Sequence, residues 1–97
     1  MAHPRHALDP AFITPIRLSL MAALRDDEVD FGTLRDLVEA SDSVVSKGIA
    51  TLEEAGYVTT AKMYAGNRPR TRVRATAKGR GAYARHLAAL RAIAGDG

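Results

Sequence analysis

Residues 41–58 constrain the fold of this chain more than any other segment, because they contain a short amphipathic helix with its own start and stop signals. Ser41 or Asp42 can cap the start of the helix, and Gly56 follows its last turn, where glycine ends many helices. The opposite faces differ in polarity, so one side packs on a larger body and the other remains available to a partner. The predicted buried stripe consists of Val45, Ile49, Leu52 and Ala55.

Two further helices are predicted before this segment. Thr14 and Pro15 suit the start of the first helix, because threonine caps well and proline needs no N–H at the first position. The largely acidic segment at residues 25–28 (Arg-Asp-Asp-Glu) ends it. A short extended piece at residues 29–31 follows, and Asp30 can cap the second helix. The inward residues of these two helices are Ile16, Leu20, Leu24, Phe31, Leu34 and Val38.

Two strands and a long helix are predicted after it. The strands cover residues 57–64 and 70–75, and the connection at residues 65–69 is too long for a tight two-residue hairpin. Thr76 then caps a last helix that runs to about Ala94. Its apolar stripe, which we expect to be partly core, consists of Tyr83, Leu87, Leu90 and Ala94.

This order of elements predicts a mainly α (α+β) fold, a winged helix-turn-helix with a two-stranded wing and a long C-terminal dimerisation helix. Residues 1–8 are expected to form a flexible arm, and residues 9–97 a single domain. In this geometry the second helix of the motif (the recognition helix) lies in the major groove of DNA. The wing contacts the adjacent backbone or minor groove.

The charge of the chain is divided unevenly along its length. Residues 1–61 hold five Lys or Arg and ten Asp or Glu, whereas residues 62–97 hold nine Lys or Arg and a single acid, Asp96. Such a cationic field requires an anionic partner or simple solvation, and nucleic acid is a common partner of this kind. The cationic part includes Arg68, Arg70, Arg72 and Arg74 at every second position.

Several classes of function are not indicated. The chain has no cysteine, so disulfides and thiolate metal sites are excluded. His3, His6 and His86 lack the spacing of a metal site, so neither a metal nor a cofactor is predicted. No nucleophile–base–acid set or phosphate loop stands out, which argues against an enzyme. Without a membrane-length apolar run or a secretory signal, a cytoplasmic location is expected.

The polar face of the recognition helix and the basic hairpin form the candidate DNA-binding surface. Lys47 can contact a phosphate or a guanine edge, and Arg68 at the hairpin tip can enter a narrow minor groove, where the negative potential is concentrated. Arg74 lies nearer the body and is the candidate for a structural ion pair. Simple solvation is the alternative for each of them. The predicted DNA-binding residues are Thr33, Ser43, Val44, Ser46, Lys47, Thr51, Asn67, Arg68, Arg70 and Arg72.

Taken together, these segments resemble the MarR/ArsR-like bacterial transcriptional regulators, and within them a group of small stand-alone winged-helix proteins. The resemblance covers roughly residues 8–92, and its most specific part is Leu-Glu-Glu-Ala-Gly-Tyr-Val followed by a basic wing and Thr-x-x-Gly-Arg. It implies a dimeric, sequence-specific DNA-binding protein that represses or activates transcription. The segments that carry it are residues 8–10, 15–18, 30–36, 41–47, 52–58, 68–71 and 76–80.

Two positions depart from the pattern of this family. Gly48 stands in the middle of the recognition helix, where a glycine costs about 0.5–1 kcal/mol relative to alanine. Either the backbone approaches another element closely there, or the helix tolerates the loss. Glu39 stands in the turn where a glycine is common, and a side chain there adds roughly 1–2 kcal/mol of strain if the position requires a positive φ.

The last helix is longer than a body of this size needs, so we expect it to form a dimer seam together with the first helix. The predicted interface residues are Ile16, Leu20, Tyr83, Leu87, Leu90 and Ala94. A two-fold dimer holds its recognition helices about one turn of DNA apart. The predicted function is therefore a homodimeric repressor that binds an inverted-repeat operator in double-stranded DNA.

The alternative function is a winged-helix protein–protein interaction module that acts through the C-terminal helix. No small-molecule effector is indicated by the sequence. An effector would have to bind between the last helix and the winged body, where it could change the spacing of the recognition helices.

Overall fold

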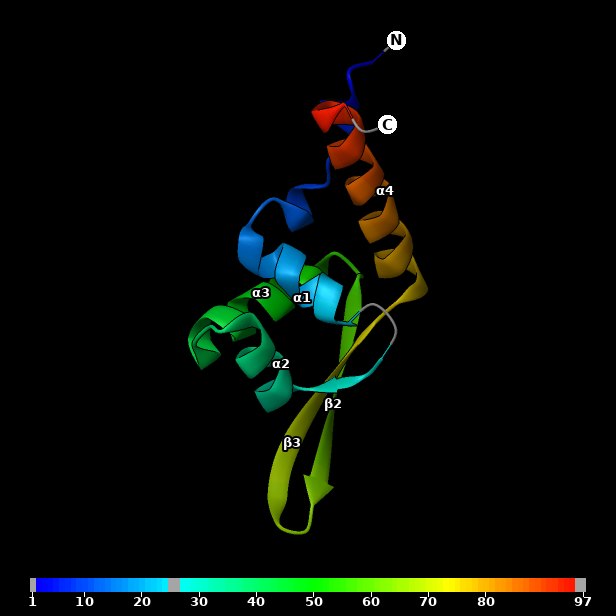
Figure 1. Ribbon diagram of the computed structural model, residues 1–97. Coiled ribbons are helices and arrows are strands. Elements are labelled where there is room, and N and C mark those ends of the chain that lie inside the picture. The colour runs from blue at the N-terminus through cyan, green and yellow to red at the C-terminus, as the bar shows by residue number, and fades with distance from the viewer. Residues whose placement is uncertain (1, 25–26, 96–97) are drawn as a thin grey trace.

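The computed structural model describes residues 2–24 and 27–95. A body of helices packs on a small antiparallel sheet, which extends into a hairpin wing at one end, while the last helix leads to the other end (Figure 1). This is the mainly helical winged helix-turn-helix that the sequence predicts. Within the described residues, the elements are η1 (Pro4–Ala7), η2 (Pro10–Phe12), α1 (Pro15–Leu24), β1 (Val29–Asp30), α2 (Phe31–Val38), α3 (Asp42–Glu54), β2 (Val58–Ala65), β3 (Arg68–Ala75) and α4 (Ala77–Ala94).

The helix-turn-helix consists of α2 and α3, and a polar side chain caps each helix. Asp30 Oδ2 accepts a hydrogen bond from Gly32 N at 3.1 Å, and Ser41 Oγ accepts one from Val44 N at 3.2 Å. Glu39 ends α2 in the left-handed conformation, with φ 53° and ψ 50°. The positive φ that would strain a side chain at this position is therefore present.

Gly48 allows α3 to cross α1 at close range. A Cβ at this position would lie 2.8 Å from Leu20 Cδ1, which is closer than ordinary van der Waals contact. Leu20 is itself fully buried, so its side chain has little room to move. Of the two explanations for this glycine, the close approach of another element is the one that the structure supports.

The core lies between the helices and the inner face of the sheet. It draws on every major element, with Leu34 from α2, Leu52 from α3 and Val73 from β3 all fully buried. Their burial is the main source of stability in a chain of this size. The acidic end predicted for α1 falls partly on residues 25–26, which lie outside the described residues. None of the helices that the structure describes is long and apolar enough to cross a membrane.

The wing is a tighter hairpin than predicted. The antiparallel pairing of β2 with β3 continues to Ala65 and Arg68, so only Gly66 and Asn67 connect the strands. The prediction of a longer connection at residues 65–69 is therefore wrong. Gly66 has a φ of +66° at the first turn position, which is the glycine position of a type II′ hairpin turn.

Pro69 is the physical reason for this error. A proline cannot donate a hydrogen bond, so it indicates a break in a strand. Here it pairs with Tyr64, one position beyond the pair that closes the turn. In an antiparallel ladder the hydrogen-bonded and non-hydrogen-bonded pairs alternate, so the Pro69 nitrogen faces away from β2. At the other edge of β3, β1 pairs with Arg72 and Val73.

α4 begins at a hydrogen-bonded junction with the end of α3 and the start of β2. Thr76 Oγ1 accepts a hydrogen bond from Gly79 N at 2.9 Å and donates one to Gly56 O at 2.7 Å. Thr76 N donates to Tyr57 O at 2.9 Å. The Thr-x-x-Gly part of the family resemblance is therefore a structural joint.

The face that α4 turns toward the body consists of small residues. Gly79, Ala82 and Ala89 are buried there, with His86 as the one larger buried side chain among the described residues of α4, whereas Tyr83 is half-buried and Leu90 is 37% exposed. The prediction that Leu90 belongs to the core is wrong, because the small residues bring α4 close to the body and leave the larger side chains at the margin of the contact.

The residues before α1 pack against the base of α4. Asp9 N donates a hydrogen bond to Nδ1 of the buried His86 at 3.0 Å, and the Tyr57 hydroxyl donates one to the Asp9 carboxylate. This bond and burial raise the pKa of Tyr57 above its ordinary value of 10.0. The Tyr57 ring stacks on Phe12 with 5.3 Å between centroids. η1 lies beside α4, and flexibility of residues 1–8 stays a prediction.

Candidate functional site

The outer face of α3 is open to solvent along its length. Ser46 and Lys47 are exposed, and Val44 is 43% exposed. The same helix buries Val45, Ile49 and Leu52 on its inner side, so the predicted division into two faces is confirmed. The predicted DNA-binding residues that this outer face brings together are Ser43, Val44, Ser46, Lys47 and Thr51.

One hydroxyl on this face already has a partner. Thr51 Oγ1 donates a hydrogen bond to Lys47 O at 3.1 Å within the helix. The single hydroxyl proton is used in this bond, so Thr51 can offer a partner only its acceptor lone pairs. Ser43 and Ser46 stand on the same outer face, nearer the start of the helix.

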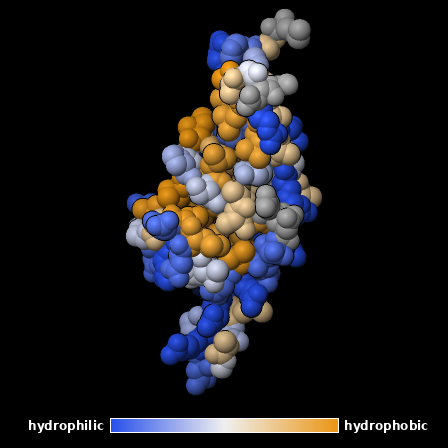
Figure 2. Space-filling view, in the orientation of Figure 1, coloured by the Kyte–Doolittle hydropathy of each residue, from blue (hydrophilic) through white to orange (hydrophobic). Residues whose placement is uncertain are grey.

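The wing carries its four arginines on one face and extends beyond the helical body (Figure 1). The strand register puts Arg68, Arg70 and Arg72 on the same side of the hairpin as Arg74. Asn67 and Arg68 are exposed at the tip, Arg70 is exposed, and Arg72 is half-buried. In the view of Figure 2 the wing is mostly hydrophilic, whereas apolar residues gather over the body above it.

Two of these arginines lie beside carboxylates in β1 and just before it (residues 28–30, the β1 segment). Arg70 Nη1 is 3.7 Å from Asp30 Oδ1, and Arg72 Nη1 is 3.5 Å from Glu28 Oε1. The sequence leads us to expect a structural ion pair at Arg74, whereas the ion pairs of the wing among the described residues are these loose contacts of Arg70 and Arg72. The reason is that β1 pairs with β3 and so brings its acidic residues to this edge.

Arg35 links the two helices of the motif. Its Nη1 bonds to Asp42 Oδ1 at 2.8 Å, and its Nε bonds to Asp36 Oδ1 at 3.2 Å. The hydrogen bonds to Asp42 and then to Asp36 raise the pKa of Arg35 above its usual value. Sequence reasoning missed this link, whose only signal is a pair of opposite charges on the two sides of the predicted turn.

A recess lies between the start of α2 and the first half of β3. Arg35, Arg68 and Arg70 line it together with Asp30. The exposed Thr33, which we predict to contact DNA, belongs to the same first turn of α2. The structure therefore brings the start of α2 and the wing to opposite sides of one cationic recess.

A second groove, with more apolar walls, lies between the start of α1 and the outer face of α3. Val44, Lys47 and Thr51 line it from α3, and Thr14 and Ile16 line it from α1. Ile16 is a predicted dimer-interface residue, and this position puts it next to the predicted DNA-binding residues.

The predicted dimer-interface residues fall into different environments. Leu20 is fully buried within the chain, so its assignment to an interface is wrong: a partner cannot reach it. Tyr83 and Leu87 are half-buried on α4, while Leu90 and Ala94 are exposed. Sequence reasoning missed Ile93, which is 43% exposed on the last turns of α4.

Most of the chain matches a known protein family. Residues 16–94 match the family described as winged helix DNA-binding domain. A comparison with the curated proteins found no match.

Several solved structures with this fold are described as transcriptional regulators. The transcriptional regulator homologue from Pyrococcus horikoshii OT3 is 26% identical with a TM-score of 0.88, over 99% of this chain and 97% of that chain. A MarR-family regulator from Silicibacter pomeroyi is 23% identical with a TM-score of 0.69, over 93% of this chain and 60% of that chain. The regulator MOSR from M. tuberculosis, solved in complex with DNA, is 18% identical with a TM-score of 0.73, over 96% and 67%.

These likenesses differ in what they cover. The chain spans nearly the whole of the Pyrococcus protein, but about two thirds or less of the other two regulators. At identities below 25%, the two longer regulators show only that this chain shares their fold. The partners and ligands of those proteins are not assigned to this chain.

Proposed function

This chain belongs to the winged helix DNA-binding domain family, and from that premise we propose that two copies of it act as a sequence-specific repressor on double-stranded DNA. Its structural relatives are transcriptional regulators, which are not enzymes. The observation that carries the proposal is the exposed outer face of α3 next to a wing with exposed arginines. We place its action in the cytoplasm, with the DNA.

Each part of this surface has a chemical role in the proposal. Lys47 and the hydroxyls of Ser43 and Ser46 reach phosphates and base edges in the major groove, and the Val44 methyls contact a thymine methyl. Arg68 enters the adjacent minor groove, where a narrow groove concentrates negative potential. Thr33 at the start of α2 and Arg70, Arg72 and Asn67 on the wing contact the backbone.

Dimerisation accounts for the exposed apolar residues of α4. Leu90 and Ile93 are 37% and 43% exposed, and burying them against a second copy gains the hydrophobic free energy that the monomer lacks. Leu87, Tyr83 and Ala94 border the same seam. A two-fold pair presents two copies of α3, so the DNA site is an inverted repeat.

DNA binding at two salt concentrations tests the proposal. The chain should bind the region upstream of its own gene, and the affinity should fall as salt rises, because phosphate neutralisation releases counterions. Arg68→Glu should reduce the affinity by about tenfold or more, since it replaces a favourable minor-groove contact with repulsion from the surrounding phosphates. Arg5→Glu is the matched control, because Arg5 is an exposed arginine on η1, beside α4. Absence of binding at low salt, or binding that ignores salt, would refute the proposal.

The same apolar residues also favour the second candidate, a protein–protein interaction module that acts through α4. Leu87→Asp discriminates between the two functions when it is compared with Lys47→Glu and Arg68→Glu. Loss of biological function through the α4 substitution alone, with both charge reversals tolerated, supports the interaction module. Loss of function through the charge reversals supports the repressor.

A further inference from the structure

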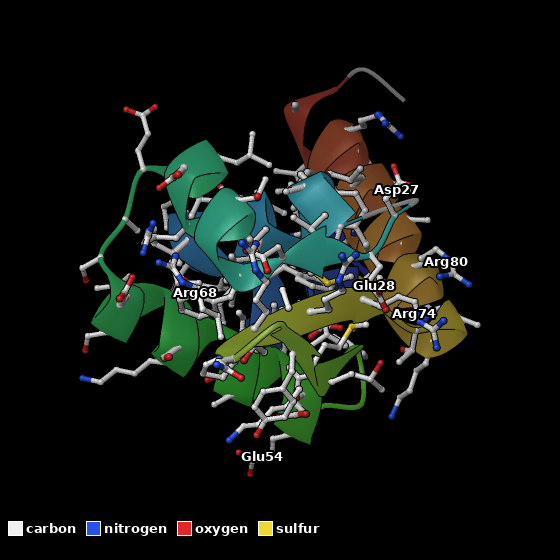
Figure 3. All side chains as sticks on the ribbon, turned by 90° about the horizontal axis from the view of Figure 1, so that it is seen from below. Asp27, Glu28, Glu54, Arg68, Arg74 and Arg80 are labelled. Carbon is white, nitrogen blue, oxygen red and sulfur yellow. The ribbon has the colours of Figure 1, made fainter. Side chains whose placement is uncertain are left out.

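Carboxylates of the β1 segment face the arginine side of the wing. In the strand register Asp30 lies directly opposite Arg72 and Val29 opposite Val73, so the same register continued one residue before β1 would bring Glu28 opposite Arg74. Figure 3 shows Glu28 and Arg74 on the same side of the sheet. The recorded ion pairs are diagonal to this register, from Asp30 to Arg70 and from Glu28 to Arg72.

Neither pair is a tight structural contact. The separations of 3.7 Å and 3.5 Å exceed the usual N–H···O distance of about 2.7–3.2 Å, so each pair is an electrostatic contact without a good hydrogen bond. The side chains of Arg70 and Arg72 are 52% and 43% exposed. Exposed pairs of this kind contribute little to folding. By contrast, the pair between Arg35 and Asp42 at 2.8 Å is a direct hydrogen bond.

We propose that Glu28 and Asp30 restrain the wing from binding DNA of arbitrary sequence, because their carboxylates compete with phosphates for Arg72 and Arg70. This inference rests on the proposed function, and it adds two specificity-determining residues to it. Each carboxylate stands within 4 Å of a guanidinium that a phosphate would need to approach. A phosphate that enters there gains the arginine but meets the repulsion of the acid.

The effect of this restraint on affinity differs between non-specific and specific complexes, where a specific (registered) complex is one in which α3 contacts the bases of its own operator. Binding to arbitrary DNA depends almost entirely on phosphate contacts, so a restraint on two wing arginines weakens it directly. A registered complex adds base contacts from α3, which Glu28 and Asp30 do not affect. The two carboxylates therefore increase the ratio of specific to non-specific affinity, which is the quantity that decides occupancy in a genome.

The test uses a short duplex of arbitrary sequence, with binding followed by fluorescence anisotropy at two salt concentrations. Glu28→Gln and Asp30→Asn each remove one charge, and asparagine still caps α2. Each variant should bind about threefold more tightly than the wild-type chain, with a steeper dependence on salt. The matched control is Glu54→Gln, which changes net charge equally at an exposed position that forms no ion pair with the described residues. It should leave the affinity near the wild-type value.

A second substitution shows whether Glu28 acts through its partner. In an Arg72→Gln background, Glu28→Gln should give no further gain in DNA affinity, because the guanidinium for which the carboxylate and the phosphates compete is absent. A gain that persists there, or equal gains for Glu28→Gln and Glu54→Gln, would overturn the inference. Weaker binding by Glu28→Gln would overturn it as well, since the carboxylate would then position the arginine.

The outcome also separates this inference from the proposed function. Wild-type binding at low salt, without any gain in the two variants, rejects the restraint and leaves the DNA-binding function in place. A wild-type chain that binds no duplex at low salt rejects both.

Discussion

Gly79 and the backbone carbonyl of Tyr57 are in direct contact, with no space for a side chain between them. A Cβ at position 79 would lie 2.1 Å from Tyr57 O, far inside van der Waals contact. The same oxygen accepts the hydrogen bond from Thr76 N at 2.9 Å. The first turn of α4 therefore packs on the backbone that joins α3 to β2, and only glycine permits this approach.

Gly79→Ala should destabilise the fold by about 3 kcal/mol, because the added methyl group meets backbone that cannot rotate away. Gly81→Ala is the matched control on the same helix. There the Cβ would meet only the flexible end of Arg85, at 3.3 Å from Nη1. It should be neutral or stabilise by up to about 1 kcal/mol through helix propensity. Urea unfolding of the two variants measures the difference, and equal stabilities would contradict the packing described.

Glu39→Gly should stabilise the chain. The φ of 53° strains a residue with a Cβ by roughly 1–2 kcal/mol, and glycine removes that strain at an entropic cost of about 0.5–1 kcal/mol. The expected net gain is about 0.5–1 kcal/mol. Glu54→Gly, within α3, should instead lower stability, because the backbone there is helical. A loss of stability in Glu39→Gly, measured by thermal unfolding, would show that its side chain makes a contribution larger than the strain.

Tyr57→Phe should cost about 1–2 kcal/mol at neutral pH, because the Asp9 carboxylate loses a partly buried hydrogen-bond donor. Folding raises the pKa of Tyr57 above 10.0, so folding favours the protonated phenol. This stability is fully present below about pH 10 and is lost as the pH rises through the folded-state pKa. The difference between wild type and variant should therefore shrink in alkaline solution. Urea unfolding on both sides of pH 10 measures it, and a constant difference would contradict the assignment.

Arg68→Ala should weaken DNA binding to all sequences and reduce the slope of log affinity against log salt by about 1, as expected for the loss of one phosphate or groove contact. Arg5→Ala should leave the slope unchanged, because Arg5 belongs to η1, which lies beside α4. Anisotropy titrations over a range of salt concentrations give both slopes. Identical slopes for the two variants would mean that the wing tip does not contact DNA.

The fold was predictable wherever its signals are local. Three helix starts were predicted from capping residues, and the structure confirms Asp30, Ser41 and Thr76 as the N-caps of α2, α3 and α4. Glu39 and Gly48 were recognised as unusual, but their explanations required the turn geometry and the position of Leu20. The wing was predicted too short because Pro69 breaks a strand unless its nitrogen faces an open edge, which only the pairing register reveals.

The exposed residues of the candidate site were predictable from the sequence, but the ion pairs that these residues form within the chain were not. The split of α3 into two faces follows from helical spacing alone. The pairing of Arg35 with Asp42, and of Arg72 with Glu28, depends on a turn and a two-residue strand that bring distant segments together. Leu20 was assigned to an interface because spacing identifies an apolar stripe, whereas only packing shows whether another element of the same chain already covers it.

Thr76 joins α4, the end of α3 and the start of the wing at one point, near the middle of a molecule that is 56 Å long. If two copies associate along α4, this joint passes a small rotation at their seam on to the wing, so each protomer turns as a rigid body about the seam. The largest displacement then occurs at the tips formed by Gly66 and Asn67. The distance between the two tips, and with it the operator spacing that a dimer accepts, would be determined by the end of the molecule farthest from DNA.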